Sequence, residues 1–131
     1  IMTVHYEACT HLHRVIQQIK DAGMKAGAAI NPSTPVNLLS EVIADLDLVC
    51  IMSVNPGFAA QKFIANSVNK IKELKQLIKE KGSHALIEVG GGINLETGKL
   101  VAEAGADVVV AGSFVFGSSD PVETIAQLQA L

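Results

Sequence analysis

Along the chain a strand-like spacing of apolar and polar positions is followed by a helix-like spacing, and this pair of patterns recurs five times. Nearly continuous apolar runs, such as residues 48–52 and 108–111, are typical of strands buried on both faces of a parallel sheet. Between such runs apolar residues recur three and four positions apart, as Leu12, Ile16 and Ile19 do. The pattern therefore predicts five successive βα units.

Turn and capping residues bound these predicted elements. The expected strands span residues 1–7, 25–30, 48–54, 85–89 and 108–111. The expected helices cover residues 11–22, a segment from Pro35 with Thr34 as N-cap, residues 64–81, residues 94–105, and a segment opened by Asp120 and Pro121. In the last of these, Glu123 is placed to complete a capping box, and most lysines of the 64–81 helix should form a solvated surface.

Repeated βα units predict an α/β fold in which helices cover a parallel sheet. Residues 1–131 would form a single domain of five units, but a (β/α)₈ TIM barrel needs about 250 residues, so the chain would be a partial barrel. The alternative is a rearranged open five-stranded parallel sheet with helices on both faces. Because the sequence reads as a strand from Ile1, we expect a natural truncation, a fragment or an engineered half-barrel.

Composition narrows the class of protein. Apolar residues make up 49% and charged residues 18%, which excludes intrinsic disorder. The net charge of −3 gives no electrostatic support for a nucleic-acid partner, and no apolar run is long enough for a membrane span. Cys9 and Cys50 are too few for a disulfide framework and fit a cytoplasmic location.

Candidate chemistry lies where the predicted strands end, because functional groups of such folds gather beyond the C-terminal strand ends. Three consecutive strands end in glycine-rich turns, at residues 53–58, 89–92 and 111–113. Glycine admits positive φ and a close approach of the backbone, which directs amides toward an anion. These turns predict an anion site.

Several segments resemble one known family. They are residues 4–8 (VHYEA), 25–27 with 31–32 and 34–35, 52–58 (MSVNPGF) with 61–64 (QKFI), 87–89 with 91–93, and 104–107 with 111–113. They are similar to the ribulose-phosphate 3-epimerase family over essentially the whole chain, and the NPGF and QKF segments are highly specific. The match corresponds to strands four to eight of the family's barrel, with the first three absent.

The resemblance implies an isomerase of the pentose phosphate pathway and carbohydrate metabolism. It would interconvert D-ribulose 5-phosphate and D-xylulose 5-phosphate by proton transfer at C3, using two aspartates and a divalent metal of the zinc, iron, manganese or cobalt type. One family aspartate, an acid–base group and metal ligand, stands just before the two glycines that follow strand seven. Here that position is Gly90, so we expect its role to be lost and this chain to bind no metal.

The resemblance also assigns substrate-binding positions. The phosphate-binding residues would be Gly57, Phe58, Ala59, Ala60, Gly91, Gly92, Gly112 and Ser113. His5 and Met52 would line the pocket, although core packing explains Met52 equally well. The family has two glycines at positions 59 and 60, so if either needs positive φ the alanine costs about 1–2 kcal/mol and weakens this loop.

Three readings of function remain open. By lineage the chain is an epimerase that is inactive alone; the alternative is a non-catalytic barrel fragment or engineered half-barrel. A third reading, another phosphate-binding barrel enzyme, is disfavoured by the NPGF and QKF segments. The expected partners are a sugar phosphate or inorganic phosphate, bound weakly, and a second copy of the chain or a complementing N-terminal half.

Glu88 should face the interior of the barrel two residues below Gly90, where it would serve as a structural carboxylate or as a substitute acid.

Overall fold

The computed structural model describes residues 1–131 and contains one parallel sheet of five strands, hydrogen-bonded in chain order. The strands are β1 (Met2–His5), β2 (Ala26–Ile30), β3 (Leu48–Met52), β4 (Leu86–Gly90) and β5 (Val108–Val110). The helices are α1 (Leu12–Asp21), α2 (Ser67–Glu80), α3 (Leu95–Ala104), α4 (Ser113–Phe116) and α5 (Pro121–Gln129). Three 3₁₀ segments complete the chain: η1 (Tyr6–Ala8), η2 (Val36–Leu39) and η3 (Ile43–Asp45).

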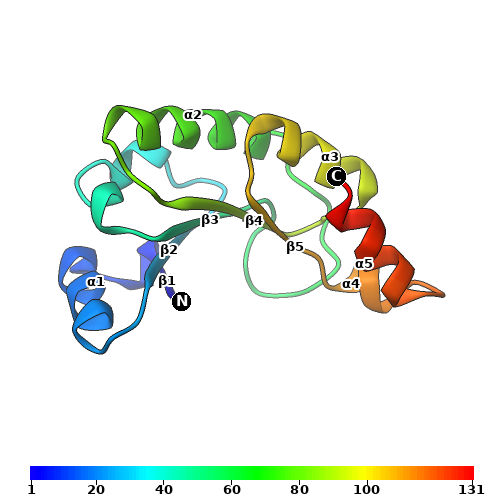
Figure 1. The fold of residues 1–131 in the computed structure, drawn as a ribbon, viewed down its shortest axis with the longest axis horizontal. Helices are drawn as coiled ribbons and strands as arrows, with labels where there is room; N and C mark the ends of the chain where they lie inside the picture. The colour runs from blue at the N-terminus through cyan, green and yellow to red at the C-terminus, as the bar shows by residue number, and fades with distance from the viewer.

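The sequential strand order places all connecting helices on the same side of the sheet, because parallel crossovers are right-handed. Figure 1 shows α1, α2, α3 and α5 following one another in an arc around the outside of the strands. A sheet with helices on both faces requires the strand order to reverse, so the rearranged alternative is wrong. The fold is a sector of a (β/α)₈ barrel with β1 and β5 as free edges.

The two faces of the sheet have different surroundings. The main core of 20 buried residues includes Ile30, Val49, Ile51, Ile87 and Val89, which point toward the helices. The opposite, inner face carries only a small cluster of Ala29, Leu48 and Cys50, with Met52 packed against it. The inner face of this sector therefore has no covering layer.

One predicted helix is absent. The segment after β2 forms η2 and η3 instead, and the Thr34 side chain caps neither of them; its hydroxyl donates to the carboxylate of Glu7. The buried residues Val36, Leu39 and Val42 are three positions apart, which matches the three-residue turn of a 3₁₀ helix.

Other differences concern element ends. Each observed strand is shorter than its predicted range or shifted from it by a residue. For example, β1 ends at His5 and not at residue 7, and α2 begins at Ser67 and not at residue 64. The short helix α4 was not predicted. At α5 the Asp120 carboxylate accepts from the Glu123 amide, but the Glu123 carboxylate accepts from Gln127, so the capping box is only half formed.

No helix in the chain has the length and apolar character needed to cross a membrane.

Candidate functional site

Three loops meet beyond the C-terminal ends of β3, β4 and β5. They enclose a cavity of about 160 Å³, and most of the residues predicted for anion binding line it. The lining residues are Val54, Phe58, Ala59, Ala60, Gln61, Gly91, Gly92, Ile93, Val110, Gly112 and Ser113. Of the predicted set, Gly57 lies in the same loop but outside the lining, whereas Gly90, His5 and Met52 lie elsewhere on the sheet.

Backbone amides at this cavity are free to donate. The N–H groups of Gly91, Gly92 and Gly112 make no hydrogen bond to any backbone or side-chain acceptor of the chain. Gly91 and Gly92 have φ of 117° and 66°, which glycine adopts without strain. A Cβ at Gly92 would lie 2.7 Å from the Phe63 nitrogen, and one at Gly91 would overlap Val54. Both positions therefore require glycine.

The carbonyl groups of the same loop are occupied. The fully buried Ser53 hydroxyl lies 3.0 Å from the Gly90 oxygen and 2.5 Å from the Gly91 oxygen, and the Thr97 hydroxyl donates to the Gly92 oxygen at 2.9 Å. Because these carbonyls are engaged, the unpaired N–H groups are the backbone groups left free for hydrogen bonding beside the cavity. Ser53 belongs to the predicted turn 53–58, but its bonds to the glycine carbonyls were not predicted, and neither was the role of Thr97.

The loop over the cavity contains Ala59 and Ala60, at the positions where the resemblance leads us to expect two glycines. Ala60 has φ of 59°, whereas Ala59 is not in the positive-φ region. The Gln61 side chain donates to the Asn55 oxygen at 2.6 Å and to the Phe58 oxygen at 3.0 Å, which closes the loop. The expected strain therefore falls on Ala60 alone, and the loop still reaches the cavity.

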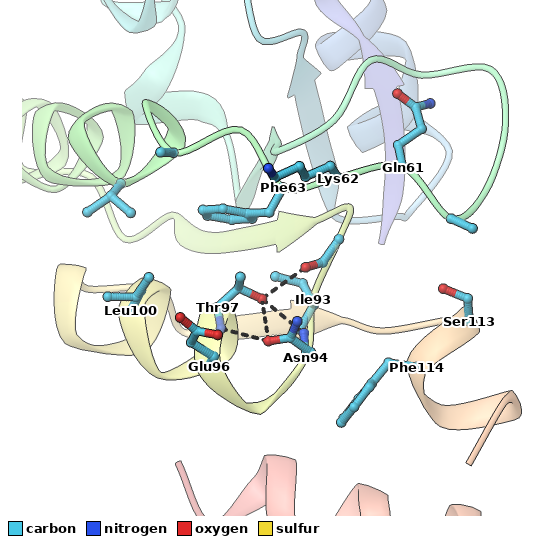
Figure 2. A pocket seen from close by; sticks show the side chains of 14 residues that line it. Gln61, Lys62, Phe63, Ile93, Asn94, Glu96, Thr97, Leu100, Ser113 and Phe114 are labelled. Carbon is cyan, nitrogen blue, oxygen red and sulfur yellow. Dashed lines mark hydrogen bonds between the residues drawn. The ribbon is translucent and has the colours of Figure 1, made fainter.

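A wider groove of about 620 Å³ adjoins this cavity and shares Ala60, Gln61, Gly92, Ile93 and Ser113 with it. Figure 2 shows Lys62 and Phe63 on one wall, the first turn of α3 opposite, and Phe114 at the start of α4. Asn94 and Thr97 bond each other in a complete capping box at this first turn.

Gly90 lies at the end of β4, on the inner face. The ideal Cβ position there is 3.7 Å from the Val110 Cβ and 4.0 Å from the Cys50 sulfur, and φ is outside the positive region. The backbone therefore admits an aspartate, but the residue present carries no carboxylate. Gly90 thus lacks the carboxylate that the resemblance leads us to expect here, although the backbone would admit one.

Other inner-face residues are placed by the register. Cys50 pairs with Glu88 and Met52 pairs with Gly90, so Glu88 does share a face with Gly90, two residues deeper. Burial, reinforced by the nearby Glu88 carboxylate, raises the pKa of the Cys50 thiol to about 12. Met52 packs against the small inner cluster, its sulfur 4.0 Å from that of Cys50.

The residues at this edge do not fit a divalent metal. Gly90 supplies no donor, and Cys50 holds its proton at neutral pH. No three His, Cys, Asp or Glu side chains of the chain are close enough to hold one ion.

A second polar cluster joins β1, the loop after β2 and α2. The Glu7 carboxylate accepts from the Asn31 amide at 2.6 Å and from Thr34, and lies 3.5 Å from His5 Nδ1. Lys70, only 6% exposed, donates to the Asn31 oxygen at 2.7 Å and to the Pro32 oxygen at 3.3 Å. Lys70 is thus an exception to the solvated lysine surface.

These features define the class of protein: a sector of a (β/α)₈ barrel with an amide-lined cavity at its C-terminal edge. Solved structures of 3-hexulose-6-phosphate synthase have the same fold. One, at 20% identity, gives a TM-score of 0.69 over 98% of this chain and 59% of that chain. The Salmonella typhimurium protein, at 21% identity, gives 0.65 over the same shares. At these identities the likeness establishes the fold alone.

The chain belongs to the ribulose-phosphate 3-epimerase family, whose profile matches residues 1–116. It is 55% identical to ribulose-phosphate 3-epimerase of Bacillus subtilis over 98% of this chain and 60% of the relative. Identity is 47% to the chloroplastic Arabidopsis thaliana enzyme, over 99% and 47%, and 41% to the Escherichia coli enzyme, over 99% and 58%. The chain thus spans about half to three-fifths of the length of these relatives.

Proposed function

We propose that the chain forms the phosphate-binding part of an epimerase-type site, with D-ribulose 5-phosphate and D-xylulose 5-phosphate as its ligand class. The observation that carries the proposal is the set of unpaired amides of Gly91, Gly92 and Gly112 beside a cavity of about 160 Å³. Several N–H donors directed at one point stabilise a phosphate, especially where acceptors have been removed. Membership of the family supports this choice of ligand.

The site is tested by following backbone amide chemical shifts while inorganic phosphate is added. We expect weak, saturable shifts at Gly91, Gly92, Gly112 and Ser113, and the same shifts with D-ribulose 5-phosphate. Chloride at equal ionic strength is the control. Shifts confined to other surfaces would reject this phosphate site.

The epimerisation itself, a metal-assisted 1,1-proton transfer at C3, needs proton-transferring groups that this chain does not supply at the matched position. Gly90 can neither accept nor donate a proton, and loss of one acid–base group costs about 10²–10⁴-fold in rate. Since the residues present do not fit a metal, no step of the proposed function of this chain uses one. We propose that the chain binds the sugar phosphate without converting it.

A coupled assay for D-xylulose 5-phosphate tests this second part. We expect no turnover from the chain, and none from Gly90→Asp, because restoring one carboxylate does not restore its catalytic partners. Turnover by the unaltered chain near an ordinary enzyme's roughly 10 s⁻¹ would refute it.

A second candidate function is non-catalytic. Residues 1–131 would form one domain, a barrel sector that associates with a second copy of the chain or with a complementing N-terminal half. Its support is the inner face of the sheet, where Leu86 is 44% and Val110 is 50% exposed. Free parallel edges and exposed apolar surface favour association with another chain.

A further inference from the structure

Ionisable side chains at the C-terminal edge of the sheet are concentrated at β1. The residues that end or directly follow the other four strands are Asn31 and Pro32, Ser53 to Asn55, Gly90 to Gly92, and Ala111 to Ser113. None of them titrates near neutral pH. β1 ends at His5, and Glu7 follows in η1. Among the strand ends, His5 and Glu7 are therefore the ionisable pair.

Glu7 is held rigidly by the neighbouring loop. One carboxylate oxygen accepts from the Asn31 amide and the Thr34 hydroxyl, and the other lies 3.5 Å from His5 Nδ1. Partial burial acts to raise the pKa of Glu7, but the hydrogen bonds from Thr34 and Asn31 outweigh it, so the pKa lies below its usual value. Lys70, on the far side of the loop, fixes the carbonyls of Asn31 and Pro32.

This arrangement orients the imidazole of His5. A carboxylate beside Nδ1 favours the tautomer with its proton on that nitrogen, which leaves Nε2 as an acceptor. The side chain is 38% exposed, so a ligand can reach the ring. By register His5 aligns with Ala29, Cys50 and Glu88, which places it on the inner face that also carries Gly90.

The inner face of a barrel sector is concave, so groups at β1 and at β4 and β5 face a shared space. A ligand whose phosphate is held by Gly91, Gly92 and Gly112 would extend its carbon chain over this face, toward β1. We propose that His5, positioned by Glu7, accepts a hydrogen bond through Nε2 from a hydroxyl at the carbohydrate end of the bound sugar phosphate. The inference rests on the proposed function. It adds a second contact, a hydrogen bond to a hydroxyl of the sugar, which inorganic phosphate cannot make.

The experiment is a pair of titrations of the chain with its histidines labelled, one with inorganic phosphate and one with D-ribulose 5-phosphate. We expect the loop amides at Gly91 and Gly92 to shift with both ligands. The ring nitrogen and Cε1–H resonances of His5 should shift only with the sugar phosphate. His5→Phe should lower the affinity for the sugar phosphate about 3- to 10-fold, the value of one hydrogen bond, and leave that for inorganic phosphate unchanged.

Two variants separate the proposal from a general effect on folding. Glu7→Gln keeps an oxygen for Asn31 and Thr34 but removes the charge, so the ¹⁵N shifts of His5 should move toward a mixture of tautomers, with a smaller loss of sugar-phosphate affinity. His13→Phe, on the exposed surface of α1, should change neither affinity.

The outcomes that contradict the proposal are distinct. If the loop amides shift with both ligands while the His5 resonances do not respond to the sugar phosphate, the phosphate site stands and the His5 contact is wrong. If His5→Phe weakens both ligands equally, the contact is also wrong. If no loop amide responds to either ligand, the phosphate site fails and the His5 contact fails with it. Should His5→Phe not fold, the unaltered chain's His5 resonances alone decide.

Discussion

Single residues decide how well the loops beside the cavity hold their shape. Gly91 and Gly92 adopt positive φ and lie against Val54 and Phe63, so no other residue fits there. Ala60 adopts φ of 59°, a conformation that costs an L-residue about 1–2 kcal/mol. The same backbone requirement is thus met without strain on one side of the cavity and with strain on the other.

Replacing Ala60 by glycine should therefore stabilise the chain. We expect Ala60→Gly to raise the free energy of unfolding by up to about 1 kcal/mol, because relief of positive-φ strain exceeds the entropy that glycine adds to the unfolded chain. Inorganic phosphate should also bind more tightly. Denaturant unfolding followed by circular dichroism gives the first value.

Ala59→Gly is the matched control, since Ala59 lies outside the positive-φ region. It should lower the free energy of unfolding by about 0.5–1 kcal/mol, through entropy alone. Equal effects of the two substitutions would show that φ at position 60 carries no strain.

At the level of elements, the loop after β2 is fixed from two directions by charged side chains. Glu7 from η1 binds its Asn31 amide and Thr34 hydroxyl, and Lys70 from α2 binds its carbonyls. Burial holds the pKa of Lys70 below its usual value, although Glu7 favours the charged form. These contacts replace the helix cap that the sequence predicted at Thr34.

Lys70→Met should be destabilising, because it keeps the apolar stem of the side chain but leaves the Pro32 carbonyl without its donor and the Asn31 carbonyl with the Thr34 amide alone. We expect a loss of about 1–3 kcal/mol in the free energy of unfolding, measured by denaturant titration. Lys72→Met, at an exposed position of the same helix, should change it by less than about 0.5 kcal/mol. Similar losses for both variants would contradict the role of Lys70.

The opposite edge of the sheet contains a pH-sensitive contact between elements. Asp47, before β3, accepts from the Ala26 amide at 2.9 Å and lies 2.8 Å from His84 Nε2. The hydrogen bond with His84 is the main reason why the pKa of Asp47 lies below its usual 3.8. A lowered carboxyl pKa contributes stability above pH 3.8 that is lost as the pH falls through the lower, folded-state value.

We therefore expect Asp47→Asn to be less stable than the unaltered chain at pH 6 and the difference to shrink steadily below about pH 4. Unfolding titrations at pH 6, 5, 4 and 3 measure it. A difference that is constant over this range would show that the charge of Asp47 contributes nothing.

At the scale of the whole molecule, the one-sided arrangement of helices leaves the inner face of the sheet unprotected. Leu86 is 44% exposed there and Ile1, beside β1, is 62% exposed, while the main core cluster lies between the strands and the helices. Large exposed apolar side chains on an uncovered sheet face favour association with another surface.

We expect the chain to form a homo-oligomer at micromolar concentration, measured by sedimentation. Leu86→Lys, on the inner face, should shift it toward the monomer. Leu100→Lys on α3, equally exposed at 45%, should leave the association unchanged. A well-folded monomer at all concentrations would reject self-association through this face.

The sequence by itself determined what depends on local pattern. The five strands, the helices α1, α2, α3 and α5, and the glycines that follow the first three of these helices are predicted by periodicity and backbone preference, which act within a few residues. The order of the strand ends also placed the residues lining the cavity at one edge, because parallel strands bring their C-terminal ends together.

Only the tertiary structure decided what depends on contacts distant in sequence. Ser53 reaches Gly90 and Gly91, and Lys70 reaches Asn31, over nearly forty positions. The segment after β2 forms 3₁₀ turns and not the predicted helix, and the Thr34 hydroxyl binds Glu7, 27 positions earlier in the chain. The side of the sheet that the helices cover likewise follows from strand order, a property of the assembled sheet, and not from any residue's own preference.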